Sequence, residues 1–253
     1  MHKHTHKQAL ISASQRLDGE AGQAHAAEVV GWRRLRGGVW RVWVENRKFV
    51  VVLGCIIFFK TAIADLNSIS GASMQPTLLD GDKIWVNKLA YDVRIPFTGV
   101  SLAERSAPQR GDIVIIDSST ANKRLVKRIV GIPGDIIHIQ NNLLVINGVA
   151  ADYEILARED DALIILEQLA DRVHQAQLSP HYMNRVSRSD GPDVVPEGQY
   201  YVLGDNRDNS ADSRVHGFIP RGEIVGRSSS VVFSLDRENS FLPRSKRFFA
   251  ALD

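Results

Sequence analysis

The sequence lacks several features that would each point to a class of protein. Its 253 residues include a single cysteine, Cys55, which excludes an intramolecular disulfide framework and a cysteine-rich zinc site. Charged residues make up 24% and the net charge is only +2, so the composition does not indicate disorder, a collagen or a polytopic membrane protein. There is no internal repeat, no glycine-rich phosphate loop and, beyond residue 64, no basic-aromatic pattern typical of a nucleic-acid surface. We therefore expect no cofactor, no metal and no nucleic-acid partner.

The small net charge hides an uneven distribution along the chain. Residues 1–48 contain nine Lys or Arg against four Asp or Glu, a net of +5, so the remaining residues carry −3. Six of those nine cations crowd into sixteen positions directly before the most apolar run, residues 49–64. Positive charge is retained on the cytoplasmic side of a membrane. The pattern favours a single N-terminal membrane anchor over residues 49–64, with the rest of the chain outside the cytoplasm.

Two other interpretations of this apolar run stay open. Sixteen residues rising 1.5 Å each span about 24 Å, less than a hydrocarbon core of about 30 Å, so a buried core helix is an alternative. Lys60 could snorkel outward, and local thinning could cover the deficit. Ala62-Ile63-Ala64 has the small-x-small pattern of a signal-peptide cleavage site, but the preceding 48 residues are too long for an ordinary n-region. We expect an uncleaved anchor, preceded by a disordered tail over 1–30 and a basic juxtamembrane segment over 31–48.

Residues 65–253 are dominated by short β-rich runs separated by turns. Asn141-Asn142 lies between two such runs and predicts a hairpin. Many strands with scattered turns favour an antiparallel β barrel or folded sheet over βαβ layers. The sequence therefore predicts a mainly β domain. The strands are expected at residues 83–87, 112–117, 125–130, 136–140, 143–147, 199–203 and 223–235.

One segment departs from this pattern. Between Ala157 and Gln177 the apolar residues Ile165, Leu166, Leu169 and Val173 recur at helical spacing. The spacing predicts a small helix within an insertion over about residues 150–195, beside the β core.

The first of three polar segments that could carry chemistry surrounds Ser73. A serine between small residues and ahead of Pro76 can present its hydroxyl and a backbone N–H together. A nucleophile and an oxyanion donor are needed side by side in acyl transfer. Serine and proline also mark plain loops, so this segment alone leaves both interpretations open.

The second segment is the strand that contains Lys127. With a period of two, Lys127 shares a face with Leu125 and Ile129, while Arg128 lies opposite. A lysine on an apolar face is costly as a cation, so its pKa is expected to fall towards neutrality. A neutral amine can take a proton from a serine. A lysine whose stem packs and whose amine reaches solvent is the alternative.

The third segment runs from Gly204 to Arg214, without a large apolar side chain. It holds three Asp, two Arg and two Asn, which could suggest a calcium loop, but Arg207 and Arg214 oppose cation binding. A salt-bridged loop that braces a site fits better. In this interpretation Ser210 orients the lysine amine, and Asp212 with Arg214 holds the loop rigid.

Together, in this order, the three segments resemble three motifs of bacterial type I signal peptidases. The matching stretches are Ser73–Leu78, Lys127–Asp135 and Gly204–Arg214, with a weaker fourth match at Arg110–Val114. The resemblance extends over roughly residues 49–233. It implies a folded antiparallel β domain behind a single transmembrane helix in the cytoplasmic membrane, with the catalytic domain on the outer, periplasmic side.

The resemblance also implies a serine protease with a Ser–Lys dyad, a recognised variant of the catalytic triad. Ser73 would attack the scissile carbonyl, Lys127 would remove its proton and later activate water, and Ser210 would orient the amine. The Ser73 backbone N–H would be one oxyanion donor. Substrates would be exported preproteins with small residues at positions −1 and −3. Many family members carry a serine two residues before the nucleophile as a second oxyanion donor, but here that position is Gly71.

Three rival functions remain. A Ser–His–Asp hydrolase would use His216, just after the third segment. A dedicated peptidase for one exported protein or pilus subunit would keep the dyad and change the substrate. An anchored β domain without activity would bind a partner through the polar loop. Separate replacement of Lys127 and His216 by alanine discriminates the first rival, and cleavage of a preprotein discriminates the last.

Overall fold

The structure is a computed structural model, in which the chain divides into two units, Met1–Ile57 and Phe58–Asp253. The predicted tail over 1–30 and most of the basic segment over 31–48 lie outside the residues that the structure describes. The described residues are 46–95, 98, 100–169, 171–179, 188–237 and 239–252.

Residues 46–58 form an α-helix, which η1 (Phe59–Ile63) follows as a short π-helix. The apolar side chains from Phe49 to Phe59 are exposed. Within the described ranges, no helix combines the length and the apolar character needed to cross a membrane. The anchor over residues 49–64 therefore stays a prediction.

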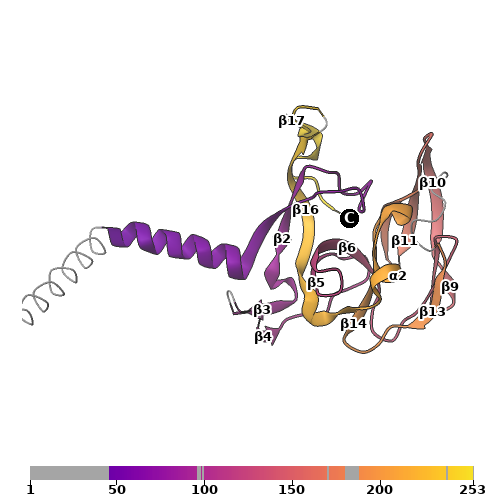
Figure 1. The fold of residues 1–253 in the computed structure, drawn as a ribbon, viewed down its shortest axis with the longest axis horizontal. Helices are drawn as coiled ribbons and strands as arrows, with labels where there is room; N and C mark the ends of the chain where they lie inside the picture. The colour runs from indigo at the N-terminus through magenta and orange to yellow at the C-terminus, as the bar shows by residue number, and fades with distance from the viewer. Residues whose placement is uncertain are drawn as a thin grey trace, which may run out of the picture. The chain divides into compact units, whose positions relative to one another are not determined.

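The second unit is mainly β, as the sequence predicts, and its principal sheet is antiparallel with the order β1-β2-β16-β5-β6-β14-β15. In Figure 1 the long strand β16 runs beside β2 and β5. β2 alternates between buried and exposed side chains because one face of the sheet covers the core. The strands of this sheet are β1 (Ala64–Ser68), β2 (Asp82–Asn87), β5 (Ile113–Ser118), β6 (Lys123–Gly131), β14 (Gln199–Leu203), β15 (Ile219–Pro220) and β16 (Ile224–Asp236), with β17 (Leu242–Pro243) paired to β16.

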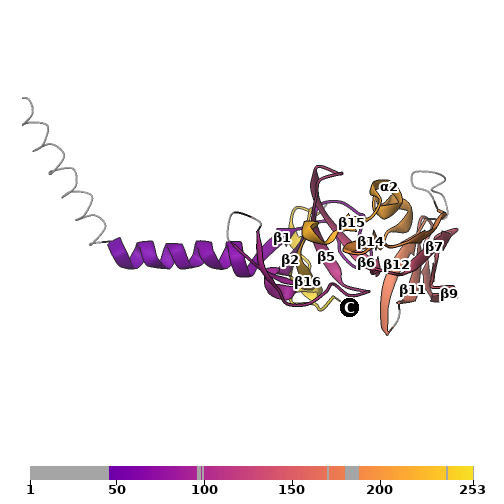
Figure 2. The ribbon, with the colours of Figure 1, turned by 90° about the horizontal axis from the view of Figure 1, so that it is seen from below.

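Three smaller antiparallel sheets complete the described strands. The orders are β10-β11-β12, β13-β7-β8-β9 and β3-β4. Figures 1 and 2 both place β9 and β11 at the opposite end of this unit from β2 and β16. Their bounds are β3 (Asp92–Arg94), β4 (Ser101–Glu104), β7 (Ile136–Gln140), β8 (Leu143–Ile146), β9 (Val149–Ala150), β10 (Asp152–Arg158), β11 (Leu163–Leu169), β12 (Arg172–Leu178) and β13 (Asp190–Val194). The remaining short helices are η2 (Lys88–Ala90), η3 (Arg207–Asn209), α2 (Ser213–His216), η4 (Arg221–Glu223) and η5 (Ser245–Arg247).

The predicted hairpin at Asn141-Asn142 is confirmed. Gln140 pairs with Leu143, and the two asparagines between them adopt φ values of 51° and 66°. Two consecutive residues with positive φ give the turn whose twist matches that of the flanking strands, and asparagine tolerates this conformation.

The predicted helix between Ala157 and Gln177 is wrong, because this segment contributes to the three strands β10, β11 and β12. The buried face of β11 includes Glu167 between Ile165 and Leu169, so a carboxylate interrupts the apolar alternation. On β12 the buried positions include His174, whereas Val173 is exposed. Polar residues inside and an apolar residue outside together mimic helical spacing.

Candidate active site

Ser73 lies in the loop between β1 and β2, which is tied to the core on one side of the serine. Met74 and Leu78 are buried in a cluster with Ile84 and Ile113, and the Leu78 N–H donates to the Met74 carbonyl oxygen at 2.8 Å. The apolar residues that follow Ser73 in the sequence therefore fix the loop and leave the half-buried serine at its surface.

The other tie on Ser73 comes from the polar loop. The backbone N–H of Asn206 donates to the Ser73 carbonyl oxygen at 3.1 Å, and its side-chain Nδ2 donates to the Ala72 carbonyl oxygen at 3.1 Å. Asn206 therefore holds the peptide groups on both sides of Ser73, the one that leads into the residue and the one that leads out of it.

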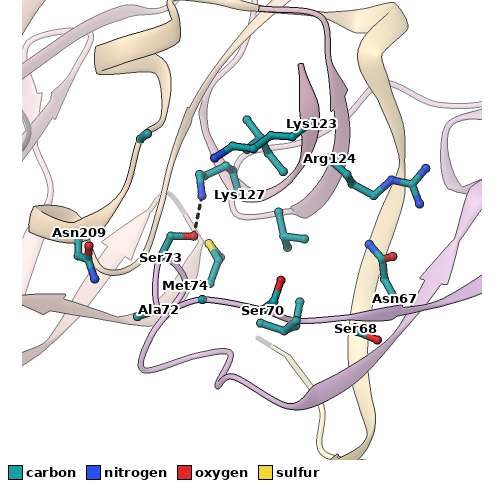
Figure 3. Close-up of a pocket in the computed structure, with 15 residues that line it drawn as sticks. Asn67, Ser68, Ser70, Ala72, Ser73, Met74, Lys123, Arg124, Lys127 and Asn209 are labelled. Carbon is teal, nitrogen blue, oxygen red and sulfur yellow. Dashed lines mark hydrogen bonds between the residues drawn. The ribbon is translucent and has the colours of Figure 1, made fainter. Parts of the chain in front are cut away.

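Lys127 reaches this serine from strand β6. Its side chain shares a face with Leu125 and Ile129, as predicted, and the residue is only 3% exposed. Lys127 Nζ donates to Ser73 Oγ at 2.7 Å (Figure 3). The structure thus brings together two residues that lie 54 positions apart in the sequence.

Burial sets the proton affinity of this lysine. Loss of solvation lowers the pKa of Lys127 to about 8, and the charges of Lys123 and Arg214 act in the same direction. Asp212 and Asp205 oppose the shift without reversing it. A substantial fraction of Lys127 is therefore neutral in mildly alkaline solution and able to accept the Ser73 proton.

A cavity of about 500 Å³ opens in front of the dyad. Its walls combine residues from the end of β1, the Ser73 loop and the first half of β6 (Figure 3). Ile69, Met74, Leu125 and Val126 give it an apolar lining next to Ser73 and Lys127. A small apolar side chain can be buried there beside the nucleophile.

The polar loop is held by buried ion pairs rather than by apolar packing. Arg128 Nε and Nη2 donate to Asp205 at 2.9 and 2.8 Å, and both side chains are 1% exposed. Arg214 Nη2 donates to Asp212 at 2.8 Å, and Asp212 also accepts from the Gly204 N–H at 3.0 Å. Asp212 and Arg214, which the sequence predicts to hold the loop rigid, are thus paired with each other. Their role in bracing the site stays a prediction.

Ser210 is buried, and within the described residues its Oγ has no hydrogen-bond partner, so no bond to Lys127 is formed here. It lies against Gly204, where a Cβ would collide with Ser210 Oγ and with the Ser73 carbonyl oxygen. Glycine at 204 thus allows Ser210 and Ser73 to approach the same backbone. The role of Ser210 in orienting the amine stays a prediction.

On the oxyanion side of the site, position 71 supplies no side-chain donor. The Ser73 N–H donates no hydrogen bond within the described part of the chain, so it is available to a ligand. Gly71 has a φ of 102° and offers no side-chain donor. The Ser70 hydroxyl points into the same cavity as Ser73 (Figure 3).

The sequence alone gave no role to three residues that the structure connects to this site. Asn206 lies inside the polar segment, where nothing in the sequence sets it apart from its polar neighbours. Glu167 and His174 lie in the segment predicted to be helical, where Glu167 Oε1 accepts from Arg207 Nη1 at 2.8 Å and His174 Nε2 lies 3.1 Å from Glu167 Oε2. A carboxylate in the middle of the apolar run from Leu163 to Leu169 was the available signal. Among the described residues, no group of acidic, histidine or cysteine side chains is arranged to hold a metal ion.

Comparison with known proteins gives consistent matches. Residues 40–233 match the family described as signal peptidase, peptidase S26. Signal peptidase I from Pseudomonas fluorescens is 33% identical over 220 residues, covering 80% of this chain and 76% of the relative. Signal peptidase I from Pseudomonas aeruginosa is 32% identical with the same coverage. A crystal structure of a signal peptidase I from Enterococcus faecalis matches 48% of this chain and 97% of its own, with 28% identity and a TM-score of 0.31.

Proposed function

The chain belongs to the signal peptidase family, peptidase S26, and we propose that Ser73 is its nucleophile and Lys127 its general base. Its activity is the removal of signal peptides by serine-protease chemistry. The observation that carries the assignment of residues is the 2.7 Å contact between Lys127 Nζ and Ser73 Oγ, made by a buried lysine.

The proposed reaction has two stages. Neutral Lys127 takes the Ser73 proton as Oγ attacks the scissile carbonyl, and the Ser73 N–H stabilises the developing oxyanion. Collapse of the tetrahedral intermediate transfers the proton to the leaving amine and leaves an acyl-enzyme. Lys127 then takes a proton from water, which attacks the ester. When the ester bond breaks, the proton passes from Lys127 to Ser73 Oγ, and the serine and the neutral lysine are restored.

Two unpaired strand edges indicate how a peptide would be held. Among the described strands, β1 pairs with β2 only, and the first half of β6 pairs with β5 only. Both strands contribute residues to the cavity. An extended substrate can add to such an edge through backbone hydrogen bonds, with alternate side chains directed into the apolar lining. This arrangement supports substrates with small residues at positions −1 and −3.

Residues 49–64 are proposed as the membrane anchor, with the catalytic domain on the outer side of the cytoplasmic membrane. The support is the basic segment before them and the run of exposed apolar side chains from Phe49 to Phe59. Only eight residues separate Ala64 from Ser73, so an anchored enzyme would cut close to the bilayer, where a signal peptide emerges.

The test is cleavage of an exported preprotein by the full-length protein. We expect Ser73→Ala to lower kcat/KM by at least about 1,000-fold. Lys127→Ala should lower it about 100- to 10,000-fold, and Lys127→Arg should do the same because arginine stays protonated. His216→Ala is the matched control and should retain activity. Full activity in Lys127→Ala, or its loss in His216→Ala with Lys127→Ala active, would overturn the dyad.

A further inference from the structure

The cavity in front of the dyad is lined by cations of one strand and by no anion. Lys123, Arg124 and Lys127 of β6 contribute to its wall, and none of its lining residues is Asp or Glu. Because a cavity between protein walls concentrates the field of its charges, unbalanced charge there selects among ligands.

The three cations differ in what neutralises them. Arg124 Nε and Nη2 donate to the two carboxylate oxygens of Asp117 at 2.7 and 3.1 Å, so its charge is balanced within the protein. Lys127 is bonded to Ser73. The ammonium group of exposed Lys123 has no ion-pair or hydrogen-bond partner within the described residues.

The Lys123 side chain also points to the side of the cavity where Lys127 lies. Residues 123 and 127 lie on the same face of the strand, and Figure 3 shows the two amines directed to the same side of the cavity, whereas the Arg124 guanidinium points away. The effect of the Lys123 charge on the pKa of Lys127 is consistent with this placement. The unneutralised positive charge of the wall is therefore the one that a bound substrate meets.

The strand sets where on the substrate this charge acts. Four residues of strand span about 13 Å. A peptide that runs along the free edge of β6, with its scissile bond at Ser73, would place a residue about four positions from that bond beside Lys123.

We propose that Lys123 is a specificity-determining residue that favours substrates with a carboxylate about four residues from the scissile bond. The proposal rests on the proposed function, because it takes cleavage from Ser73. The attraction is that of a partly solvated ion pair, which corresponds to a preference of about two- to fivefold and weakens as salt is added.

The test uses one neutral preprotein-derived peptide with Asn placed three, four or five residues from the scissile bond, on either side, and the matching set with Asp. With the full-length wild type, kcat/KM should be about two- to fivefold higher for the Asp peptide at one or more of these positions. Lys123→Gln should bring that ratio to one, and Lys123→Glu should bring it below one. Arg124→Gln is the matched control, because it removes one positive charge from the neighbouring position. It should keep the wild-type ratio, since the Arg124 guanidinium points away from the side of the cavity that Lys123 and Lys127 share.

Two outcomes overturn the proposal: a wild-type ratio of one at every position, or an unchanged ratio in Lys123→Gln. Cleavage of the neutral peptide tests the proposed function independently of the Asp-to-Asn ratio. If wild type cleaves it and Ser73→Ala does not, the dyad stands whatever the ratio. If wild type cleaves no peptide, the dyad and the role of Lys123 fail together.

Discussion

Two kinds of buried cation occur around the candidate active site of this protein. In the polar loop and its supports, Arg128, Arg207 and Arg214 are each paired with a carboxylate, and their side chains are 1% exposed. Lys127 is similarly buried but has a serine hydroxyl as its partner. The paired arginines fix the loop, whereas the lysine, whose hydrogen-bond partner carries no charge, has a lowered pKa and can act as a base.

The contrast is sharpest between neighbours on β6. Arg128 and Lys127 are adjacent in sequence and project to opposite faces of the strand. On one face of the strand Arg128 donates to Asp205, and on the other Lys127 donates to Ser73. Guanidinium does not lose its proton in proteins and amine does, so the residue types match the two tasks.

The largest predicted change in stability follows from removing the carboxylate partner of a buried arginine. Glu167→Gln keeps the shape of the side chain but leaves Arg207 as an unpaired buried charge. Removing one partner of a buried pair costs about 3–5 kcal/mol, so urea denaturation should show a loss of that order in the free energy of unfolding.

The double variant Glu167→Leu with Arg207→Met is the control, because it removes both charges and refills the space. It should recover a large part of the stability lost in Glu167→Gln. If the double variant is no more stable than the single one, charge pairing is not what distinguishes the loop.

The opposite change in stability is expected at Lys127. A lysine whose pKa is lowered destabilises the folded state wherever both folded and unfolded forms hold the proton, which is below pH 8. Lys127→Met fills the same space without a charge and should raise the free energy of unfolding by on the order of 1–3 kcal/mol at pH 7. The variant should be inactive and more stable.

The pH dependence of this stability gain tests whether desolvation of the lysine is its cause. As pH rises from about 8 to 10.5, wild-type Lys127 loses its proton in the folded state first, so the advantage of Lys127→Met should shrink over that interval. Ser73→Ala keeps the lysine and should keep the wild-type pH dependence of stability. An advantage that is constant from pH 7 to 10 would show that packing, and not desolvation, is responsible.

Local patterns predicted much of this architecture. The strands β7 and β14 begin and end where the sequence predicts them. β7 alternates because one of its faces lies on the core, whereas four consecutive residues of β14 are buried. The apolar neighbours of Lys127 likewise predicted the burial that lowers its pKa. These features depend on residues a few positions apart.

The failures arise where burial depends on a distant partner. Glu167 is tolerated inside β11 because Arg207, forty positions later, neutralises it. Nothing near Glu167 in the sequence reveals that partner, so the run was predicted to be a helix. The clamp of Asn206 on Ala72 and Ser73 is equally non-local, spanning 134 positions.

The smallest predicted effect tests how far Lys127 senses a neighbouring charge. kcat/KM on a neutral peptide should rise with pH through about 8 as Lys127 becomes neutral. Lys123→Gln removes a positive charge on the same strand face, so the pKa of Lys127 should rise. The rise of kcat/KM with pH, which is the limb of the pH profile, should therefore move to higher pH by about 0.2–0.7 units. Arg124→Gln should leave the pH dependence of kcat/KM in place, because the Arg124 guanidinium points away from Lys127. Equal movement in both variants would mean that net strand charge acts on Lys127, and an unmoved limb in Lys123→Gln would mean that burial alone sets its pKa.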